Sequence, residues 1–374
     1  MKRYWTILAL LLVAATLSAS DKHDSRQKKP EVAVPATWQS QEPFHIADPK
    51  DAFPKGEWWT VFGDPELNQY EGRALAANQT LQAAIARLAE ARAAAQITQA
   101  GLFPELDAGP SVARERVSGY RPNLPATQTG TPITQNVFTI PFNINYELDL
   151  FGEVRNNVRS AEAALQATAA DTQNAQLIVT TDLAADYFQM RSLDAEIADV
   201  QEAIDYEQKG LNLVNQRHDQ GIASGLDVAQ QQSVLDAASA QLSLLQQQRA
   251  QFQHALATLQ GIPASQFTAP VRPLNSPLPD VPVALPSLLL ERRPDIASAE
   301  RQVAAANGQI GVARAAFFPR ILLGLTGGWQ STAASSLFSL PSALWSVGAS
   351  ALEPVVAGGR IHARYRQTKS IYDE

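Results

Sequence analysis

The chain has 374 residues, 45% of them hydrophobic and 18% charged, which is the composition of a folded protein rather than a disordered one. Its formal net charge of -7 argues against nucleic acid as a partner, because phosphate binding needs a basic face. The absence of cysteine excludes disulfides, thiol nucleophiles and thiolate metal sites. No two histidines stand at metal-ligand spacing, so the sequence predicts no metal and no cofactor; the histidines are His23, His45, His218, His254 and His362.

Residues 1–20 have the pattern of a signal peptide. Cations at positions 2 and 3 precede an apolar run over residues 7–17, and Ser18-Ala19-Ser20 is a small-residue cleavage site. The apolar run is too short to span a membrane comfortably. We therefore predict export with cleavage between Ser20 and Asp21, followed by an extended, proline-rich arm over residues 21–65.

Residues 66–261 predict one structural unit that contains a helix, two strands and a long helical hairpin. The first helix covers residues 66–101, which are rich in Ala, Leu, Gln, Glu and Arg, contain no proline, and have apolar positions three and four apart. Two strand-like stretches follow, at roughly 105–117 and 136–149, separated by a loop that contains prolines and glycine.

The second of these strands has the clearest pattern in the chain. Over residues 138–149, apolar and polar residues alternate in strict period two, and the run is longer than the 9–11 residues that a membrane strand needs. Two carboxylates, Glu147 and Asp149, lie two residues apart, an arrangement that acid–base chemistry also uses. No catalytic partner is evident, so lining charge that favours cations is the preferred interpretation. We expect the polar face to line a barrel lumen: Thr139, Asn143, Asn145, Glu147 and Asp149.

A helix over residues 153–220 would be roughly 100 Å long at 1.5 Å per residue. A turn then leads to a second helix over residues 227–259, with Gly221 as the left-handed residue after the first helix and Asp227 as the N-cap of the second. The turn is either an ordinary connection or a contact site for a partner, and its place at the end of so long a helix favours contact. Arg217 either caps the helix end or is only solvated. The predicted contact tip is Arg217, Gly221, Ile222, Ala223, Ser224, Gly225, Leu226 and Asp227.

A proline-rich linker over residues 262–286 precedes a second copy of the unit, residues 287–374. Residues 293–321 repeat the pattern of residues 78–106 at a constant offset of 215, and strands are again expected, at about 321–330 and 343–352. The second copy stops before its long hairpin, so we expect that the chain as given does not by itself make a working tunnel. Four strands do not close a barrel alone, whereas three copies of the chain would supply twelve.

Three segments resemble the outer membrane factor (TolC-like) family, and most closely its multidrug-efflux lipoprotein branch (OprM/NodT-like). They are Trp58-Trp59…Phe62-Gly63-Asp64-Pro65…Asn78…Leu81, then Arg217…Gly221-Ile222-Ala223-Ser224-Gly225-Leu226-Asp227-Val228, and finally Arg293-Pro294-Asp295-Ile296…Ala299-Glu300…Ile310-Gly311…Phe318-Pro319. Together these segments extend over nearly the whole mature chain, and the third is the most specific.

The resemblance implies a mainly α protein with membrane β structure. In this fold, each subunit of a homotrimer gives four strands to a twelve-stranded outer-membrane barrel, and long helices form a periplasmic tunnel. The family also implies outer-membrane lipid around the barrel, a periplasmic adaptor protein at the hairpin tips, and an inner-membrane pump of the RND or another type, in a Gram-negative bacterium. The branch usually has a lipidated cysteine at the cleavage site, and Ser20 in its place argues against lipidation.

The function that these observations favour is a passive exit duct for drugs or other small solutes in a tripartite efflux system. Two alternatives stay open at this point: the outer-membrane conduit of a type I protein secretion system, and a periplasmic coiled-coil scaffold without a pore. A scaffold has no need of the alternation at residues 138–149. An enzyme is not expected, because no nucleophile–base or metal arrangement stands out in the sequence.

Overall fold

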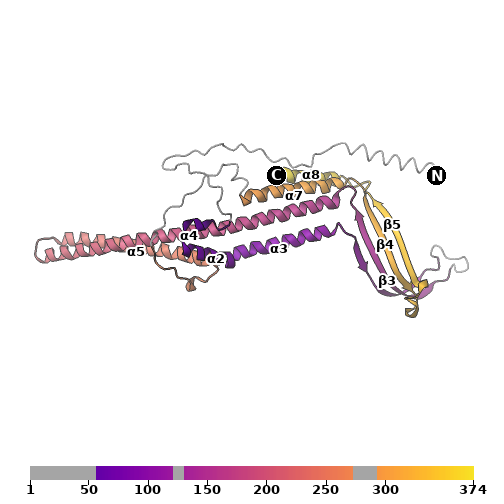
Figure 1. Cartoon of the computed structure of the whole chain (residues 1–374), viewed down its shortest axis with the longest axis horizontal. Coiled ribbons are helices and arrows are strands. Elements are labelled where there is room, and N and C mark those ends of the chain that lie inside the picture. Colours follow the sequence, from indigo (N-terminus) through magenta and orange to yellow (C-terminus); the bar gives the residue numbers. More distant parts are fainter. Residues whose placement is uncertain (1–55, 121–129, 273–292) are drawn as a thin grey trace. The chain divides into compact units, whose positions relative to one another are not determined.

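The computed structural model describes residues 56–120, 130–272 and 293–374 (Figure 1). The signal peptide, the cleavage site at Ser20 and Asp21, and most of the predicted arm and linker lie outside these residues. The described chain forms two compact units, which are taken separately below. One contains residues 92–166 and 300–374, and the other contains residues up to 91 and from 167 to 299. No helix in the described ranges combines the length and the apolar character that crossing a membrane requires.

The first unit contains an antiparallel sheet, in which β3 pairs with both strands that precede it in sequence. Strands β1 and β2 lie one after the other along β3, because the chain breaks at Gly109 and Pro110, and the single strand expected at 105–117 is therefore two strands. β3 pairs in turn with β4, and β4 with β5. The bounds are β1 (Glu105–Ala108), β2 (Ser111–Val117), β3 (Ile133–Leu148), β4 (Arg320–Ser331) and β5 (Ala343–Leu352), with short helices η5 (Ala334–Ser336) and η6 (Leu340–Ser342) between the last two.

The internal repeat predicted from the sequence is present in the structure. Helices α3 (Gln79–Ala100) and α7 (Pro294–Ala315) both have 22 residues, and their first and last residues differ by the offset of 215 found in the sequence. The strand that follows each helix begins at the same offset, since β1 starts at Glu105 and β4 at Arg320. Helix α8 (Arg360–Asp373) begins after Gly359 and is the last element of the second copy.

Small residues let α7 approach the start of α4 (Glu153–Asp219) closely. A Cβ atom on Gly308 would lie 2.9 Å from the Cβ atom of Ser160, and one on Gly311 would lie 2.6 Å from the Cγ atom of Asn156. The Ser160 hydroxyl donates a hydrogen bond to the Ala305 carbonyl oxygen at 2.8 Å. This close contact between α7 and α4 is therefore possible only because the two glycines have no side chains.

The second unit shows that the first predicted helix is two helices. The expected helix over residues 66–101 ends at Ala77 and restarts at Gln79, as α2 (Pro65–Ala77) and α3. Asn78 between them is extended, with ψ of 122°. Its side-chain oxygen accepts from the Leu81 amide at 3.0 Å, and its side-chain nitrogen donates to the Leu259 carbonyl at 2.9 Å. The break is a new N-cap that also attaches α3 to the end of α5 (Gly225–Leu259).

Aromatic residues from four segments form the core of the second unit. Trp59 in η2 (Trp58–Phe62) is 3% exposed, so the predicted extended arm is wrong over its last residues, where burial of the indole folds the chain into a short helix. Asp64 then caps α2 through the amides of Glu66 and Leu67. The buried core is Trp59, Leu67, Tyr70, Ala74, Val179, Leu183, Ala184, Tyr187, Met190, Leu256, Ala257, Phe267 and Ala269.

Glu71 on α2 is a buried carboxylic acid. It is 0% exposed, and neither of its side-chain oxygens has a hydrogen-bond partner within the described part of the chain. Burial raises the pKa of this group from 4.5 to about 8. Because the folded pKa lies above the unfolded one, the free energy of unfolding has its full value below pH 4.5, where Glu71 is protonated in both states. It falls as the pH rises towards 8, because the unfolded chain then releases the Glu71 proton more readily.

We predict that Glu71→Gln removes this loss. The variant should match the parent protein at pH 4 and exceed its free energy of unfolding at pH 9 by on the order of 1–3 kcal/mol, because a neutral amide has no charge to desolvate. Chemical denaturation at the two pH values measures the difference. Glu90→Gln, at an exposed position on α3, is the matched control and should leave the pH dependence unchanged. An unaltered pH dependence in Glu71→Gln would contradict the prediction.

Candidate functional site

The sheet has one polar face, which the strand register defines. Residues that pair across antiparallel strands point to the same side. Asn143 and Asn145 on β3 stand opposite Asp107 and Glu105 on β1. The Thr326 hydroxyl on β4 donates to the Asn143 side-chain oxygen at 2.9 Å. The register places these polar residues on the same face: Glu105, Asp107, Ser111, Glu115, Gln135, Thr139, Asn143, Asn145, Glu147, Thr326, Gln330, Ser346 and Ser350.

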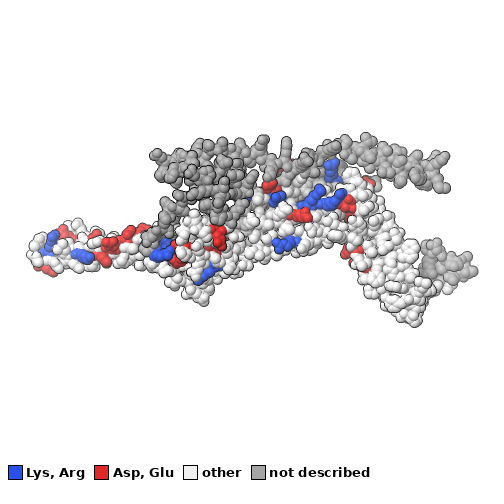
Figure 2. Space-filling model, in the orientation of Figure 1, with Lys and Arg blue, Asp and Glu red and all other residues white. Residues whose placement is uncertain are grey.

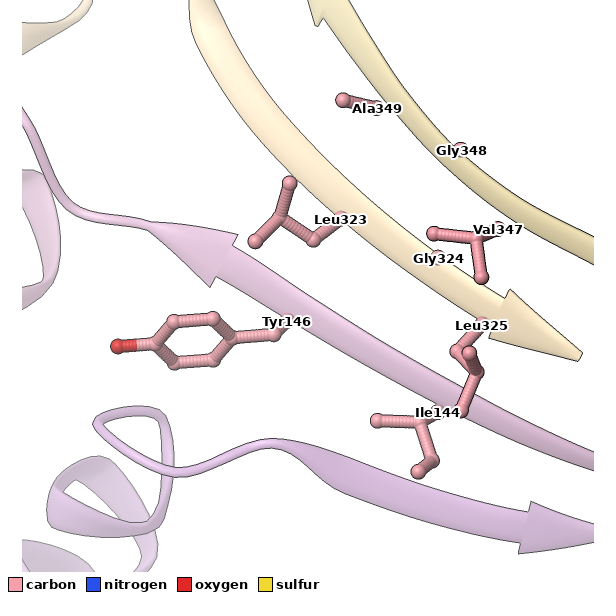
Figure 3. Close-up of a pocket in the computed structure, with 8 residues that line it drawn as sticks. All are labelled: Ile144, Tyr146, Leu323, Gly324, Leu325, Val347, Gly348 and Ala349. Atoms are coloured by element: carbon pink, nitrogen blue, oxygen red, sulfur yellow. The ribbon is translucent and has the colours of Figure 1, made fainter.

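The opposite face is apolar over most of its area. Trp345 and Val347 on β5 are 80% and 68% exposed, although large apolar side chains are normally covered in a folded protein. A shallow hollow on the sheet is lined by Ile144, Tyr146, Leu323, Gly324, Leu325, Val347, Gly348 and Ala349 (Figure 3). In the view of Figure 2, the surface over the strands is largely free of charged residues. This face therefore suits contact with an apolar medium.

The structure places four of the five predicted lumen residues together. Thr139, Asn143, Asn145 and Glu147 lie on the polar face of β3. Asp149 does not, because β3 ends at Leu148. Its carboxylate accepts from the Arg155 backbone amide at 2.9 Å and from the Arg155 Nε at 3.0 Å, which ties the strand end to the first turn of α4.

A salt-bridge group lies at the same end of the sheet. The Arg320 guanidinium pairs with Glu153, and its Nε lies 3.9 Å from a Glu147 oxygen. Glu147 therefore has a cation beside it, and its carboxylate adds little net charge to the polar face. Three carboxylates on the polar face have no such neighbour in the described contacts: Glu105 and Asp107 on β1, and Glu115 on β2, which accepts a hydrogen bond from Gln135 at 3.2 Å.

Glu105 and Asp107 are the residues that the sequence analysis missed. Both are exposed and both lie on the polar face. The signal was present, because Glu105, Leu106, Asp107 and Ala108 alternate in the same period of two as the longer strand. Four residues are too few for a pattern to stand out from chance.

The hairpin tip is a closed, well-bonded turn. Gly221 has φ of 75°, a conformation that side chains disfavour. The Arg217 carbonyl oxygen accepts from the amides of Ile222 and Ala223 at 2.8 and 3.2 Å. Arg217 thus closes the turn through its carbonyl oxygen. The sequence left two roles open for its side chain, either as a cap of the helix end or as a solvated group. The His218 ring nitrogen Nδ1 lies 2.9 Å from the Ala223 carbonyl oxygen.

Helix α5 (Gly225–Leu259) begins earlier than the sequence predicts. Ser224 is its N-cap, and the expectation that Asp227 has this role is wrong. Asp227 is the third helical residue, and the two residues bond reciprocally: the Ser224 hydroxyl accepts from the Asp227 amide at 3.2 Å, and the Asp227 carboxylate accepts from the Ser224 amide at 2.8 Å. This capping box outcompetes a cap by Asp227 alone because it satisfies two backbone donors.

The tip presents apolar side chains on this rigid turn. Ile222 and Leu226 are 72% and 66% exposed. Apolar side chains on a backbone that is already ordered lose little backbone entropy on binding, so the tip has the exposure and the fixed main chain that the predicted contact role requires. Among the described residues, no group of three or more His, Asp or Glu side chains could hold a metal ion.

Comparison with known protein families gives one clear match. The sequence model described as outer membrane efflux protein matches residues 72–262 and 285–374, which is more than half of the chain. The matched ranges contain the hairpin, the sheet and both copies of the repeat.

Two curated relatives are similar over most of the chain. The pyoverdine export outer membrane protein OpmQ of Pseudomonas aeruginosa is 35% identical over 367 residues, which are 97% of this chain and 74% of the relative. The toluene efflux pump outer membrane protein TtgF of Pseudomonas putida is 32% identical over 320 residues, which are 84% of this chain and 65% of the relative. The chain is thus shorter than both of these proteins.

Solved structures have the same fold. The outer-membrane channel OprN superposes with a TM-score of 0.80 at 29% identity, over 92% of this chain and 77% of the channel. The outer membrane protein VceC of Vibrio cholerae superposes with a TM-score of 0.78 at 26% identity, over 86% of this chain and 76% of that protein.

We predict that the two glycines of the tip respond in opposite ways to substitution. Gly221→Val forces a β-branched residue to a positive φ and should destabilise the turn by roughly 1–2 kcal/mol. Gly225→Ala is the control, because Gly225 is helical and a Cβ atom there would meet only the His218 ring, at 3.9 Å. Amide hydrogen exchange over residues 217–227 should accelerate in the first variant and stay constant or slow down in the second. Equal rates in both variants would refute this description of the turn.

Proposed function

The chain belongs to the outer membrane efflux protein family, and we propose that it is one subunit of a trimeric exit duct that carries small solutes from the periplasm to the exterior. The family membership makes the chain an outer-membrane component of an efflux system. The observation that supports the duct is the sheet, in which most polar residues lie on one face and most large apolar residues lie on the other. A water-filled bore inside a lipid bilayer requires this division.

The edges of the sheet support closure by several copies, and three copies would supply the twelve strands of the proposed barrel. In the described residues, β5 pairs only with β4, and β1 and β2 pair only with β3. Each copy therefore has two strand edges whose backbone donors and acceptors lack a ladder partner. Such groups are costly in lipid, since no water satisfies them, and pairing β5 of one copy with β1 and β2 of the next removes both edges.

The polar face would then line the bore, and the apolar face would meet outer-membrane lipid. Thr139, Asn143, Asn145 and Glu147 on β3 are lining residues in this proposal. Glu105 and Asp107 extend the lining on β1, and their carboxylates would make the bore prefer cations to anions. No basic residue on the polar face is opposite them in the register, because they pair with Asn145 and Asn143.

The hairpin tip is the proposed contact for a periplasmic adaptor protein, which in turn would connect the duct to an inner-membrane pump. Ile222 and Leu226 supply exposed apolar anchors, and the capping box of Ser224 and Asp227 fixes their position. Gly221, Ala223, Gly225 and the main chain of Arg217 shape the turn between them.

Export and anchoring complete the proposal. A signal peptide over residues 1–20, cleaved between Ser20 and Asp21, would bring the chain to the periplasm. Ser20 has no thiol that could carry a lipid chain. In this proposal the sheet holds the protein in the membrane. The named relatives export pyoverdine in one case and toluene in another, and the proposal is accordingly for small solutes as a class.

The proposal predicts that the chain extracted from outer membranes in mild detergent is a particle of three copies. In a planar bilayer with a salt gradient, the barrel of these three copies, which needs no complete helical tunnel to conduct, should show cation preference in its reversal potential. The double variant Glu105→Gln, Asp107→Asn should lower the permeability ratio of cation to anion by about twofold or more, because it removes two of the three lining carboxylates that have no cation beside them. Glu353→Gln, at an exposed carboxylate beyond β5, is the control. A monomeric particle, or a permeability ratio that the double variant leaves unchanged, would count against the proposal.

A further inference from the structure

Residues 267–272, called the strap below, cross the base of the hairpin without forming a helix or a strand. They follow α5 and the short helix η4 (Ala264–Gln266). Side chains bind the strap through its main chain. The Phe267, Ala269 and Pro270 carbonyls accept from Gln253 at 3.3 Å, Arg249 at 3.0 Å and Arg191 at 2.6 Å. The Ala269 and Arg272 amides donate to Gln253 at 3.3 Å and to Asp194 at 3.0 Å.

The side chains that hold the strap come from both arms of the hairpin. Arg191 and Asp194 belong to α4, and Arg249 and Gln253 belong to α5. Asp194 is 0% exposed, and its two oxygens accept from Arg191 at 2.9 Å and from Arg249 at 2.5 Å. The strap is therefore bound at one level to both helices, and it connects them.

The charges of this group balance. Arg191 also pairs with Glu66 at 2.6 Å, and Arg272 pairs with Asp64 at 2.6 Å, so three guanidinium groups meet three carboxylates. The Tyr187 hydroxyl donates to Asp64 at 2.7 Å and accepts from Arg272 at 3.0 Å. A buried ionic network of this kind is stable only when it is complete, because each group that loses its partner is left desolvated and unpaired.

Beyond the strap the hairpin is held together weakly. Between Asp194 on α4 and Arg249 on α5, the buried apolar residues are Leu211, Leu235 and Leu245. One polar layer accompanies them, in which the Gln231 side-chain nitrogen donates to the Glu207 carboxylate at 2.5 Å. A segment with few buried contacts opens at low free-energy cost, and its behaviour depends on how its base is fixed.

We propose that the strap is a releasable brace, which holds α4 and α5 together at their base and thereby sets how rigidly the hairpin tip is presented. Its outer end is the place of release, because the Arg272 side chain is 49% exposed whereas its partner Asp64 is 3% exposed. Water and salt reach this pair before they reach Asp194 or Arg191. The role of the brace in partner binding rests on the proposed function of the tip. Its effect on the rigidity of the hairpin does not, because this effect can be measured on the chain without any partner.

Hydrogen exchange on the isolated full chain tests the brace without any partner. Arg249→Gln removes a bond to Asp194 and a bond to the strap, and should accelerate amide exchange by about tenfold over residues 197–218 and 228–245. Arg272→Gln is the milder variant, since it alters a half-exposed side chain, and should accelerate the same amides to a smaller extent. Arg293→Gln is the control, because Arg293 forms an exposed pair with Asp295 at the start of α7.

The pattern of exchange decides the outcome. Faster exchange in the distal hairpin, with unchanged exchange in β3 and β4, supports the brace. Faster exchange in residues 267–272 alone overturns it, because the strap would then be released without any effect on the hairpin. If Arg249→Gln does not fold, the Arg272→Gln result decides the question by the same two criteria. Loss of adaptor binding is a separate measurement, so a failed proposal for the tip leaves this result valid.

Discussion

The register between β3 and β4 is the constraint on which the arrangement of the sheet depends. This pairing joins a strand of the first repeat to a strand of the second, from Phe138 opposite Ser331 to Leu148 opposite Ile321. A slip by one residue would move every side chain of β3 to the other face. Gly328 lets β4 approach β3 closely in this register, because a side chain there would collide with the Ile140 carbonyl oxygen. The register as a whole keeps Asn143 and Asn145 on the polar face.

The second unit uses a different kind of interaction for a related purpose. Its aromatic core lies at the base of the hairpin, where Tyr187 links it to the ionic network around Asp194. The distal hairpin, in contrast, has a narrow seam and an acidic exposed surface on α4, part of which is visible in Figure 2. The sheet is therefore specified by hydrogen-bonded register, and the hairpin by a fixed base and a capped tip. Both devices place exposed side chains with little freedom, as a channel wall and a contact site require.

Periodic features were predictable from the sequence, and features that depend on long-range partners were not. The alternation of β3, the repeat at an offset of 215 and the left-handed Gly221 can each be recognised from the residues of the element itself, and the structure contains all three. The break at Asn78 needs the Leu259 carbonyl, and the strap needs Arg191 and Arg249, which are far away in the sequence. Asp149 was misplaced because alternation does not reveal where a strand ends, and Asp227 because a capping box and a simple cap have similar sequences.

The central claim is that neighbouring residues of β3 face water and lipid in turn. The chain has no cysteine, so single cysteines can be introduced without background. Asn143→Cys and Asn145→Cys should react with a charged, water-soluble maleimide in outer-membrane vesicles. Phe142→Cys and Ile144→Cys should be protected from this reagent and should react with a lipid-soluble one. This alternation is the predicted result, and equal labelling of all four positions by the charged reagent would contradict the account.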